Sequence, residues 1–325
     1  MVGLYVDDLA IVSKPGEQLK QLKKKLQEQY KMKDLGLMKD MLGCRILQEN
    51  GEIKVDLEGY INKCLERFNM TDAHPVTTPL SPSTELTQDQ CPVSKEERDD
   101  MSNVPYRELV GCLLYAAIVA FPEIQFACSK LSEFNANPGR PHWEAAKHCL
   151  RYLKGIKNEQ LIFKNTGGKI ILRGFVDSDF AGDKDGRKSR SGFLFYIGGN
   201  LISWTSKKQH RLGTSSTHAE IMAASLAAKE VVYLRGILGD LGFAQNWPTE
   251  LYEDNGGCIQ IAKGEGGTRS KHFELDDLYI QEKVGEDKVK MKYVASARNP
   301  ADLLTKPTTP RELQKRLFLV YKPPF

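Results

Sequence analysis

The sequence of 325 residues lacks the features of membrane and disulfide-stabilised proteins. No uncharged apolar run approaches the ~20 residues that a membrane helix requires. The first residues carry Asp7 and Asp8 inside an apolar run without a basic start, so they do not predict a secretory signal. The seven cysteines are odd in number and scattered, with no Cys-x-x-Cys pair. Zinc-ribbon and disulfide-framework folds are therefore disfavoured, and a reducing compartment is expected.

The composition instead indicates a globular protein with an uneven charge. Apolar residues make up 41% of the chain and charged residues 27%. The net charge of +4 divides into −4 for residues 1–150 (18 Lys+Arg, 22 Asp+Glu) and +8 for residues 151–325 (28 and 20). A basic second half slightly favours a polyanionic partner, although solvated lysines are ordinary on any surface.

The first half of the chain reads as two hairpins and several helices around a linker. Residues 71–104 contain four prolines among Ser, Thr and Asp, which predicts a loop and the main boundary. The remaining expected elements are hairpins at 3–12 and 41–57, the second turned at Asn50-Gly51, and helices at 17–31, 59–68, 106–119 and 144–153.

From about residue 170 the pattern alternates between strands and helices. Strands are expected at 170–180, 191–197, 201–206, 251–252 and 289–294, and helices at 217–241, 273–284 and from Asn299 onward. Three consecutive strands, then a helix, a strand, a helix, a strand and a last helix predict an α/β domain. Its core is a mixed five-stranded sheet with helices on its faces.

Four carboxylates occupy informative positions on that sheet. Asp177 lies on the first strand, Glu220 in the first turn of the long helix, Asp254 at the end of the fourth strand, and Asp302 in the first turn of the last helix. If the first and fourth strands are neighbours, these groups meet at one edge. Four carboxylates in one place require cations, and hard oxygen ligands select Mg²⁺ or Mn²⁺. Two such ions would activate water against a phosphodiester.

Each carboxylate also has an ordinary structural interpretation. Thr217-x-x-Glu220 has the form of a capping box, and Asn299-Pro300-Ala301-Asp302 has the form of a helix start. Asp177 and its neighbour Asp179 could lie at a solvated strand end. For any one residue the structural interpretation is favoured; the four in this order favour a metal site.

Many separate blocks resemble the Pol polyprotein of copia-type LTR retrotransposons. The blocks that resemble its ribonuclease H domain are GFVDSDFAGD (174–183), KSRSGFLFYIGGNLISWTSKKQ (188–209), SSTHAEIMAASLAAKE (215–230), LYEDN (251–255), RSKH (269–272) and NPADLLTK (299–306). The blocks that resemble the reverse transcriptase and the connection are YVDD (5–8), LGCRI (42–46), YINKCLERFNM (60–70), TPL (78–80), YRELVGCLLYAAI (106–118) and HWEAAKHCLRYLKG (142–155). The resemblance covers nearly the whole chain in order.

The resemblance implies a ribonuclease H-like fold and metal-dependent hydrolysis of the RNA strand of RNA–DNA hybrids. It assigns the catalytic and metal-binding roles to Asp177, Glu220, Asp254 and Asp302, with Asp179 close enough to Asp177 for their roles to be confused. The expected partner is a hybrid nucleic acid, without a membrane, together with the remainder of a Pol polyprotein. The oligomeric state stays open.

The resemblance also divides the chain. Residues 1–80 would be a truncated reverse transcriptase palm hairpin and thumb-side segment, 81–104 a linker, 105–160 a helical connection, 165–310 the ribonuclease H domain, and 311–325 a C-terminal tail.

The YVDD block resembles the polymerase motif that carries two aspartates on the palm hairpin. Polymerisation needs a further carboxylate on an earlier strand and a pocket that aligns the nucleotide. We expect Asp7 and Asp8 to be a remnant polymerase motif, and we expect no polymerisation by this chain alone.

A basic stretch follows the first strand of the domain. Residues 184–211 contain seven Lys and Arg against one acid, Asp185. Side chains in this stretch could follow the phosphates of a nucleic acid, or they could belong to a solvated basic hairpin. The residues assigned to nucleic-acid binding are Lys188, Arg190, Lys207, Lys208 and, in a later loop, Lys271.

Two alternatives to an active ribonuclease H stay open. One is a catalytically inactive nucleic-acid-binding remnant of a decayed retrotransposon. The other is a transposase or integrase on the same fold, which Glu220 disfavours because it lies on the first long helix rather than a late one. The expected location is the cytoplasm, in a virus-like particle if the element is active, with the nucleus as an alternative.

Overall fold

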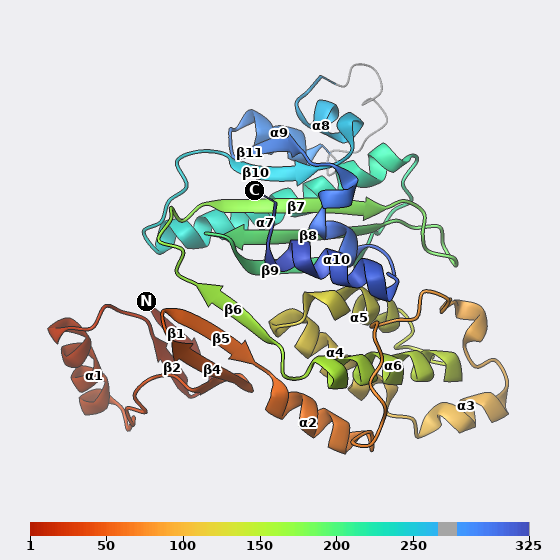
Figure 1. Cartoon of the computed structure of the whole chain (residues 1–325), viewed down its shortest axis with the longest axis horizontal. Coiled ribbons are helices and arrows are strands. Elements are labelled where there is room, and N and C mark those ends of the chain that lie inside the picture. The colour runs from red at the N-terminus through yellow and green to blue at the C-terminus, as the bar shows by residue number, and fades with distance from the viewer. Residues whose placement is uncertain (266–277, 325) are drawn as a thin grey trace.

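The computed structural model describes residues 1–265 and 278–324, and its strands form three sheets in these residues (Figure 1). A two-stranded hairpin and a four-stranded sheet belong to the N-terminal part, and a five-stranded sheet belongs to the C-terminal part. Helices lie between them. Among the described helices, none combines the length and the hydropathy that a transmembrane span needs.

The N-terminal part contains both predicted hairpins. Its elements are β1 (Val2–Tyr5), β2 (Asp8–Ile11), α1 (Glu17–Gln29), β3 (Asp40–Met41), β4 (Cys44–Glu49), β5 (Glu52–Asp56) and α2 (Glu58–Arg67). The second hairpin turns at Asn50 and Gly51, both with positive φ (51° and 76°), which is the backbone that an Asn-Gly hairpin turn adopts. One strand of this sheet, β6 (Gln160–Lys164), comes from much later in the chain and was not predicted.

The middle of the chain is helical. Its elements are η1 (Gln88–Gln90), α3 (Lys95–Ser102), α4 (Tyr106–Val119), η2 (Pro122–Ile124), α5 (Gln125–Ser132) and α6 (Arg140–Ile156). The predicted linker is therefore partly ordered, because the Ser94 side chain caps α3 by accepting the backbone N–H of Glu97. Helix α5 was not predicted, since its eight residues are too few for a clear apolar period.

The C-terminal part contains the predicted mixed five-stranded sheet. Its strands are β7 (Leu172–Asp179), β8 (Arg190–Ile197), β9 (Asn200–Lys208), β10 (Thr249–Glu253) and β11 (Val289–Tyr293). The spatial order is β11-β10-β7-β8-β9. Strands β7, β8 and β9 are antiparallel neighbours, while β10 runs parallel to both β7 and β11.

The two faces of this sheet have different coverings. Helices α7 (Ser216–Asp240), α8 (Gly256–Ala262) and α9 (Tyr279–Gly285) form one core with side chains such as Val176 and Phe193. Phe175 and Leu194, which point to the opposite face because side chains alternate along a strand, belong to the core of α4–α6. The helical connection is thus packed directly on the sheet (Figure 1).

The end of the chain covers the same face as the connection. The segments η4 (Ser296–Arg298) and η5 (Pro300–Leu304) are followed by helix α10 (Pro310–Tyr321). The expected C-terminal tail is therefore a packed helix: Val320 is fully buried, and its carbonyl oxygen accepts the hydroxyl of Tyr196 at 2.9 Å. Repeated buried apolar positions on α10, including Leu313, explain why the segment folds back.

Candidate metal centre

Three of the four predicted carboxylates converge at the carboxyl end of the central strands. Asp177, Glu220 and Asp254, here called the acidic trio, each offer an oxygen, and these oxygens all lie within 4.8 Å of one another. Within residues 1–265 and 278–324, no other group of three His, Cys, Asp or Glu meets this criterion. Parallel pairing of β7 and β10 brings Asp177 and Asp254 to one sheet edge.

Glu220 reaches this edge from helix α7. The helix is capped by Ser215, whose side chain accepts the backbone N–H of His218, so the expected capping box from Thr217 to Glu220 does not form. Glu220 is buried, and its Oε2 atom has no hydrogen-bond partner. A buried carboxylate oxygen without a partner is costly, and a bound cation would satisfy it. The ordinary capping role therefore does not account for Glu220.

Burial and mutual repulsion raise the pKa values of two members of the acidic trio, Asp177 and Glu220. Burial, followed by the nearby charges of Asp302 and Asp254, raises the pKa of Asp177 to about 7. Burial and the charge of Glu253 raise the pKa of Glu220 to about 11. Asp179, on the same strand, also has a raised pKa because of burial. A divalent cation would replace protons on Asp177 and Glu220, so the hard-oxygen donor set fits Mg²⁺ or Mn²⁺.

The fourth predicted carboxylate forms ion pairs with two basic side chains. Asp302 is almost fully buried in η5, where Lys306 Nζ lies 2.5 Å from Oδ1 and Arg316 lies 2.5 Å from Oδ2. Asp302 therefore lies beside the acidic trio, close enough to affect Asp177, without belonging to the group that meets within 4.8 Å. The helix-start interpretation also applies, since Asn299 caps η5 by accepting the N–H of Ala301.

Segment η5 is tied to strand β7 by two side chains. Asn299 Nδ2 donates to the carbonyl oxygen of Val176 at 2.8 Å, and Thr305 Oγ1 donates to Asp177 Oδ2 at 2.6 Å. Gly192 on β8 permits this approach, because a Cβ atom there would lie 2.8 Å from Leu304 Cβ. Thr305 thus fixes one oxygen of Asp177 and leaves the other for a ligand.

Sequence reasoning missed the supporting groups of this site. No role was assigned to Thr305, Lys306 or Arg316, although the NPADLLTK block that drew attention to Asp302 contains the first two. Glu253 was also missed: it is fully buried, its Oε1 accepts the N–H groups of Asp254 and Asn255, and its Oε2 has no partner. The only sequence feature that could have indicated Glu253 is its place as an acid at the end of a predicted strand, directly before Asp254.

Two of the residues expected to bind nucleic acid form ion pairs with acids of the protein. Arg190 is buried, ion-paired with Glu133 and bonded to Ser129 Oγ at 2.6 Å. Lys208 lies 2.9 Å from Glu133 and 2.8 Å from Asp183. Burial alone would raise the pKa of Asp183, but hydrogen bonds from Lys208, the backbone N–H of Gly186 and Lys130 lower it to about 2. These groups join the sheet to the end of α5.

The other basic residues keep the expected exposure or fall outside the structure. Lys207 is exposed, and Lys188 is partly exposed, with its Nζ donating to the carbonyl oxygen of His210 at 2.8 Å. Lys271 lies outside the described residues. The nucleic-acid contacts assigned to Lys188 and Lys207 stay a prediction. Arg190 and Lys208 already pair with acids of the protein, and the nucleic-acid contacts assigned to them stay a prediction as well.

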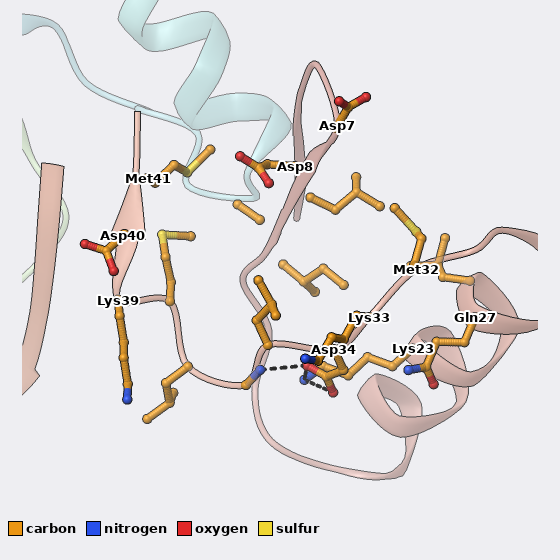
Figure 2. A pocket seen from close by; sticks show the side chains of 18 of the residues that line it. Asp7, Asp8, Lys23, Gln27, Met32, Lys33, Asp34, Lys39, Asp40 and Met41 are labelled. Carbon is orange, nitrogen blue, oxygen red and sulfur yellow. Dashed lines mark hydrogen bonds and ion pairs between the residues drawn. The ribbon is translucent and has the colours of Figure 1, made fainter. Parts of the chain in front are cut away.

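The remnant polymerase motif differs from the acidic trio. Asp7 and Asp8 are exposed, and Figure 2 shows their carboxylates turned to different sides of the hairpin. They border a hollow of about 510 Å³ together with α1 and β3. Its other charged lining residues include Lys23 and Asp34, which pair with each other at 3.0 Å. Neither aspartate belongs to a three-ligand group in the described chain.

Comparison with known proteins agrees with these observations. A family model described as "Reverse transcriptase (RNA-dependent DNA polymerase)" matches residues 1–82. The "Retrovirus-related Pol polyprotein from transposon TNT 1-94" of Nicotiana tabacum is 41% identical over 319 residues, which is 97% of this chain and 24% of that polyprotein. The "Putative transposon Ty5-1 protein YCL074W" of Saccharomyces cerevisiae is 31% identical over 232 residues, covering 71% of this chain and 73% of that protein.

Among solved structures, ribonuclease H1 from the archaeon Halobacterium salinarum aligns with 41% of this chain and 93% of its own, at 18% identity and a TM-score of 0.32. The strand order β11-β10-β7-β8-β9, with an acidic cluster at the end of β7 and β10, defines the ribonuclease H-like class of α/β folds. The chain belongs to the copia-type retrotransposon Pol polyprotein family. It spans about a quarter of the tobacco polyprotein's length.

Proposed function

We propose that this chain is a metal-dependent endoribonuclease that cuts the RNA strand of RNA–DNA hybrids. The observation that carries the proposal is the convergence of three carboxylate oxygens within 4.8 Å, on two neighbouring strands and one helix. Family membership supports the substrate class, because a reverse transcriptase copies RNA into DNA and so produces the hybrid. A reverse transcriptase model matches the same chain at residues 1–82.

The acidic trio would hold the ion. Bound Mg²⁺ or Mn²⁺ would supply a Lewis acid that lowers the pKa of water and stabilises charge on the phosphodiester. Asp177 contributes one free oxygen, since Thr305 already donates to the other. Glu220 contributes the buried oxygen that has no partner in the protein, and Asp254 approaches from the more open side because it is only partly buried.

The protein must also release protons when the ion binds. Asp177 and Glu220 have raised pKa values in the metal-free protein, about 7 and about 11, so at neutral pH Glu220 holds its proton and Asp177 is partly protonated. Metal binding requires the carboxylate forms, and its affinity is therefore expected to rise with pH. Outside the trio, Lys207 on β9 is exposed, so its charge is available to a nucleic-acid phosphate.

The second candidate function is an inactive nucleic-acid-binding remnant. The loss of Arg190 and Lys208 to internal ion pairs favours it slightly, because less positive charge is available for phosphates. The intact trio favours the enzyme. For the N-terminal part we propose no polymerisation by this 325-residue chain, because Asp7 and Asp8 lack a third carboxylate ligand in the described structure.

Cleavage of an end-labelled hybrid tests the proposal. The purified chain is incubated in Mg²⁺ with the labelled RNA strand paired to DNA, and in parallel with an RNA duplex and a DNA duplex of the same sequence. We expect internal cuts in the RNA of the hybrid alone, and we expect EDTA to abolish them. A matched Asp254→Asn chain keeps the shape of the side chain and loses its charge. Hybrid binding without cleavage by the parent chain would establish the inactive remnant instead.

A further inference from the structure

The acidic edge contains an internal cation with an unusual position. Lys306 Nζ is paired with Asp302 at 2.5 Å, and its charge also acts on Asp177, Asp179 and Glu220. It is an ammonium group among carboxylates that belong to β7, α7 and η5. A positive charge at that point does electrostatically what a metal ion would do there.

The two cations that hold Asp302 differ in exposure and in the number of their partners. The Arg316 side chain is 15% exposed, and its Nη1 donates to the carbonyl oxygens of Ser296 and Asn299, both at 3.0 Å. Arg316 is therefore fixed by three partners on the η4–η5 segment. The Lys306 side chain is 47% exposed, and Asp302 is the one ion-pair partner that the structure gives it among the described residues. Lys306 can leave the site toward solvent, whereas Arg316 cannot do so without breaking these bonds.

The backbone next to Lys306 is held firmly in place. Thr305 donates a hydrogen bond to Asp177, and Asn299 donates one to the carbonyl oxygen of Val176, so movement of η5 away from β7 would break both. Only the flexible lysine stem can change the distance between its ammonium and the carboxylates. The ion pair between Lys306 and Asp302 can therefore break while the rest of the site stays folded.

We propose that the Lys306 ammonium occupies the place of a second cation, so that the acidic trio binds one divalent ion and a second ion reaches Asp302 only when Lys306 withdraws. The inference rests on the metal centre of the proposed function. Its support is the ion pair on Asp302, the unpartnered buried oxygen of Glu220 that leaves the trio open for an ion, and the exposure of the lysine stem. A phosphate of the substrate can take over the ammonium and free the Asp302 oxygen.

Mn²⁺ binding to the full chain without nucleic acid tests this inference. Calorimetric titration or the paramagnetic signal of free Mn²⁺ gives the number of bound ions and the affinity of each. The variants are Lys306→Met, which keeps the length of the stem without the charge, and Lys306→Arg, which keeps the charge. Lys315→Met is the matched control, because Lys315 is an exposed lysine of α10 outside the site.

We expect Lys306→Met to bind the second ion at least about tenfold more tightly, because removing a unit charge a few ångströms from a cation site favours another cation. Lys306→Arg and Lys315→Met should keep the parent affinity. Adding Asp302→Asn to Lys306→Met should remove the gain, and retained binding of the first ion shows that this double variant is folded.

The failures of the two proposals are distinguishable. If the parent chain binds no Mn²⁺, the metal centre itself is contradicted. If the parent binds one ion and Lys306→Met binds the second no better, the metal centre stands and the role of Lys306 is overturned. An equal gain in Lys315→Met would also overturn it, because the effect would then come from overall charge.

Discussion

The hairpin motif with Asp7 and Asp8 and the acidic trio differ in burial. Asp7 and Asp8 lie on an exposed hairpin whose apolar residues are also open, with Leu4 73% and Val6 78% exposed. Asp177 and Glu220 lie in a buried edge, with exposures of 6% and 7%. Both motifs present carboxylates near a turn or strand end. Only the second brings oxygens from separate elements into one place.

Packing, rather than the number of acids, therefore creates the candidate metal centre. The acidic trio depends on the register between β7 and β10, on the start of α7 and on the hydrogen bonds that η5 makes to β7. The hairpin β1–β2 pairs only with itself.

The largest difference is expected on truncation. A fragment of residues 165–325 loses helices α4–α6, which share a core with Phe175, Leu194 and Tyr196 on one sheet face. It also loses the bond from Trp204 Nε1 to the carbonyl oxygen of Ala117. We expect this fragment to show no cooperative thermal unfolding by circular dichroism, because an entire sheet face becomes exposed.

Deletion of residues 1–12 is the matched comparison. It removes Asp7 and Asp8 with a hairpin that pairs with no other strand, and we expect the melting temperature of the remaining chain to change by only a few degrees. A cooperative transition of the 165–325 fragment near that of the full chain would show that the helical connection is not part of the folded unit.

The second prediction concerns pH and the stability of the metal-free chain. Folded Asp177 keeps its proton up to about pH 7, whereas the unfolded chain releases it near 3.8. The folded state binds more protons between these values, so the free energy of unfolding contributed by this group falls as pH rises. Taken alone, a pKa raised from 3.8 to about 7 corresponds to about 4 kcal/mol. Asp177→Asn in EDTA should therefore be more stable than the parent at pH 8 and nearly equal at pH 4.

Denaturant unfolding at the two pH values measures this difference. Comparison of parent and variant cancels the contributions of groups that do not interact with Asp177, such as the buried His142 and the partly buried His148, whose pKa values are lowered by burial. Asp7→Asn is the control and should not change stability at either pH. Equal destabilisation by Asp177→Asn at pH 4 and pH 8 would show that its burial carries no electrostatic cost.

A smaller effect is expected at Thr305. Thr305→Val removes the hydroxyl that donates to Asp177 Oδ2 and keeps the shape of the side chain. Partners that orient a metal ligand are typically worth about 10- to 100-fold in metal affinity. We expect Mg²⁺ affinity to fall within that range, as measured by titration, with recovery in Thr305→Ser. No change in Thr305→Val would mean that Asp177 needs no orienting partner.

The smallest effects are expected on the hairpin. Asp8→Asn should leave Mg²⁺ binding and hybrid cleavage unchanged, because Asp8 is exposed and outside any three-ligand group in the described chain. The parent chain should not extend a primer in the presence of nucleotides and Mg²⁺. Template-dependent extension that disappears in Asp8→Asn would overturn this distinction between the two motifs.

Local patterns predicted much of the fold because most elements carry their own signal. Helix α4 occupies the predicted range Tyr106–Val119, and the five strands of the large sheet follow alternation and turn residues. Strand β6 and helices α5 and α8 were missed, since each has eight residues or fewer and depends on tertiary pairing. Local pattern does not predict helix α10, because its partner, the Tyr196 face of the sheet, is distant in sequence.

The candidate site was predictable only in part, for a related reason. The three carboxylates stand at strand and helix boundaries, which the sequence patterns identify. The ion pairs of Asp302, and the internal use of Arg190 and Lys208, depend on which charges meet after folding. A run of basic residues does not reveal that Glu133, from an unpredicted helix boundary, accepts two of them.

Anomalous diffraction from crystals soaked in Mn²⁺ tests the central claim most directly, because it locates the ion against both acidic motifs in one experiment. We expect a peak among the oxygens of Asp177, Glu220 and Asp254 and none at Asp7 and Asp8. A peak at the hairpin alone, or none at the acidic trio under saturating Mn²⁺, would contradict it.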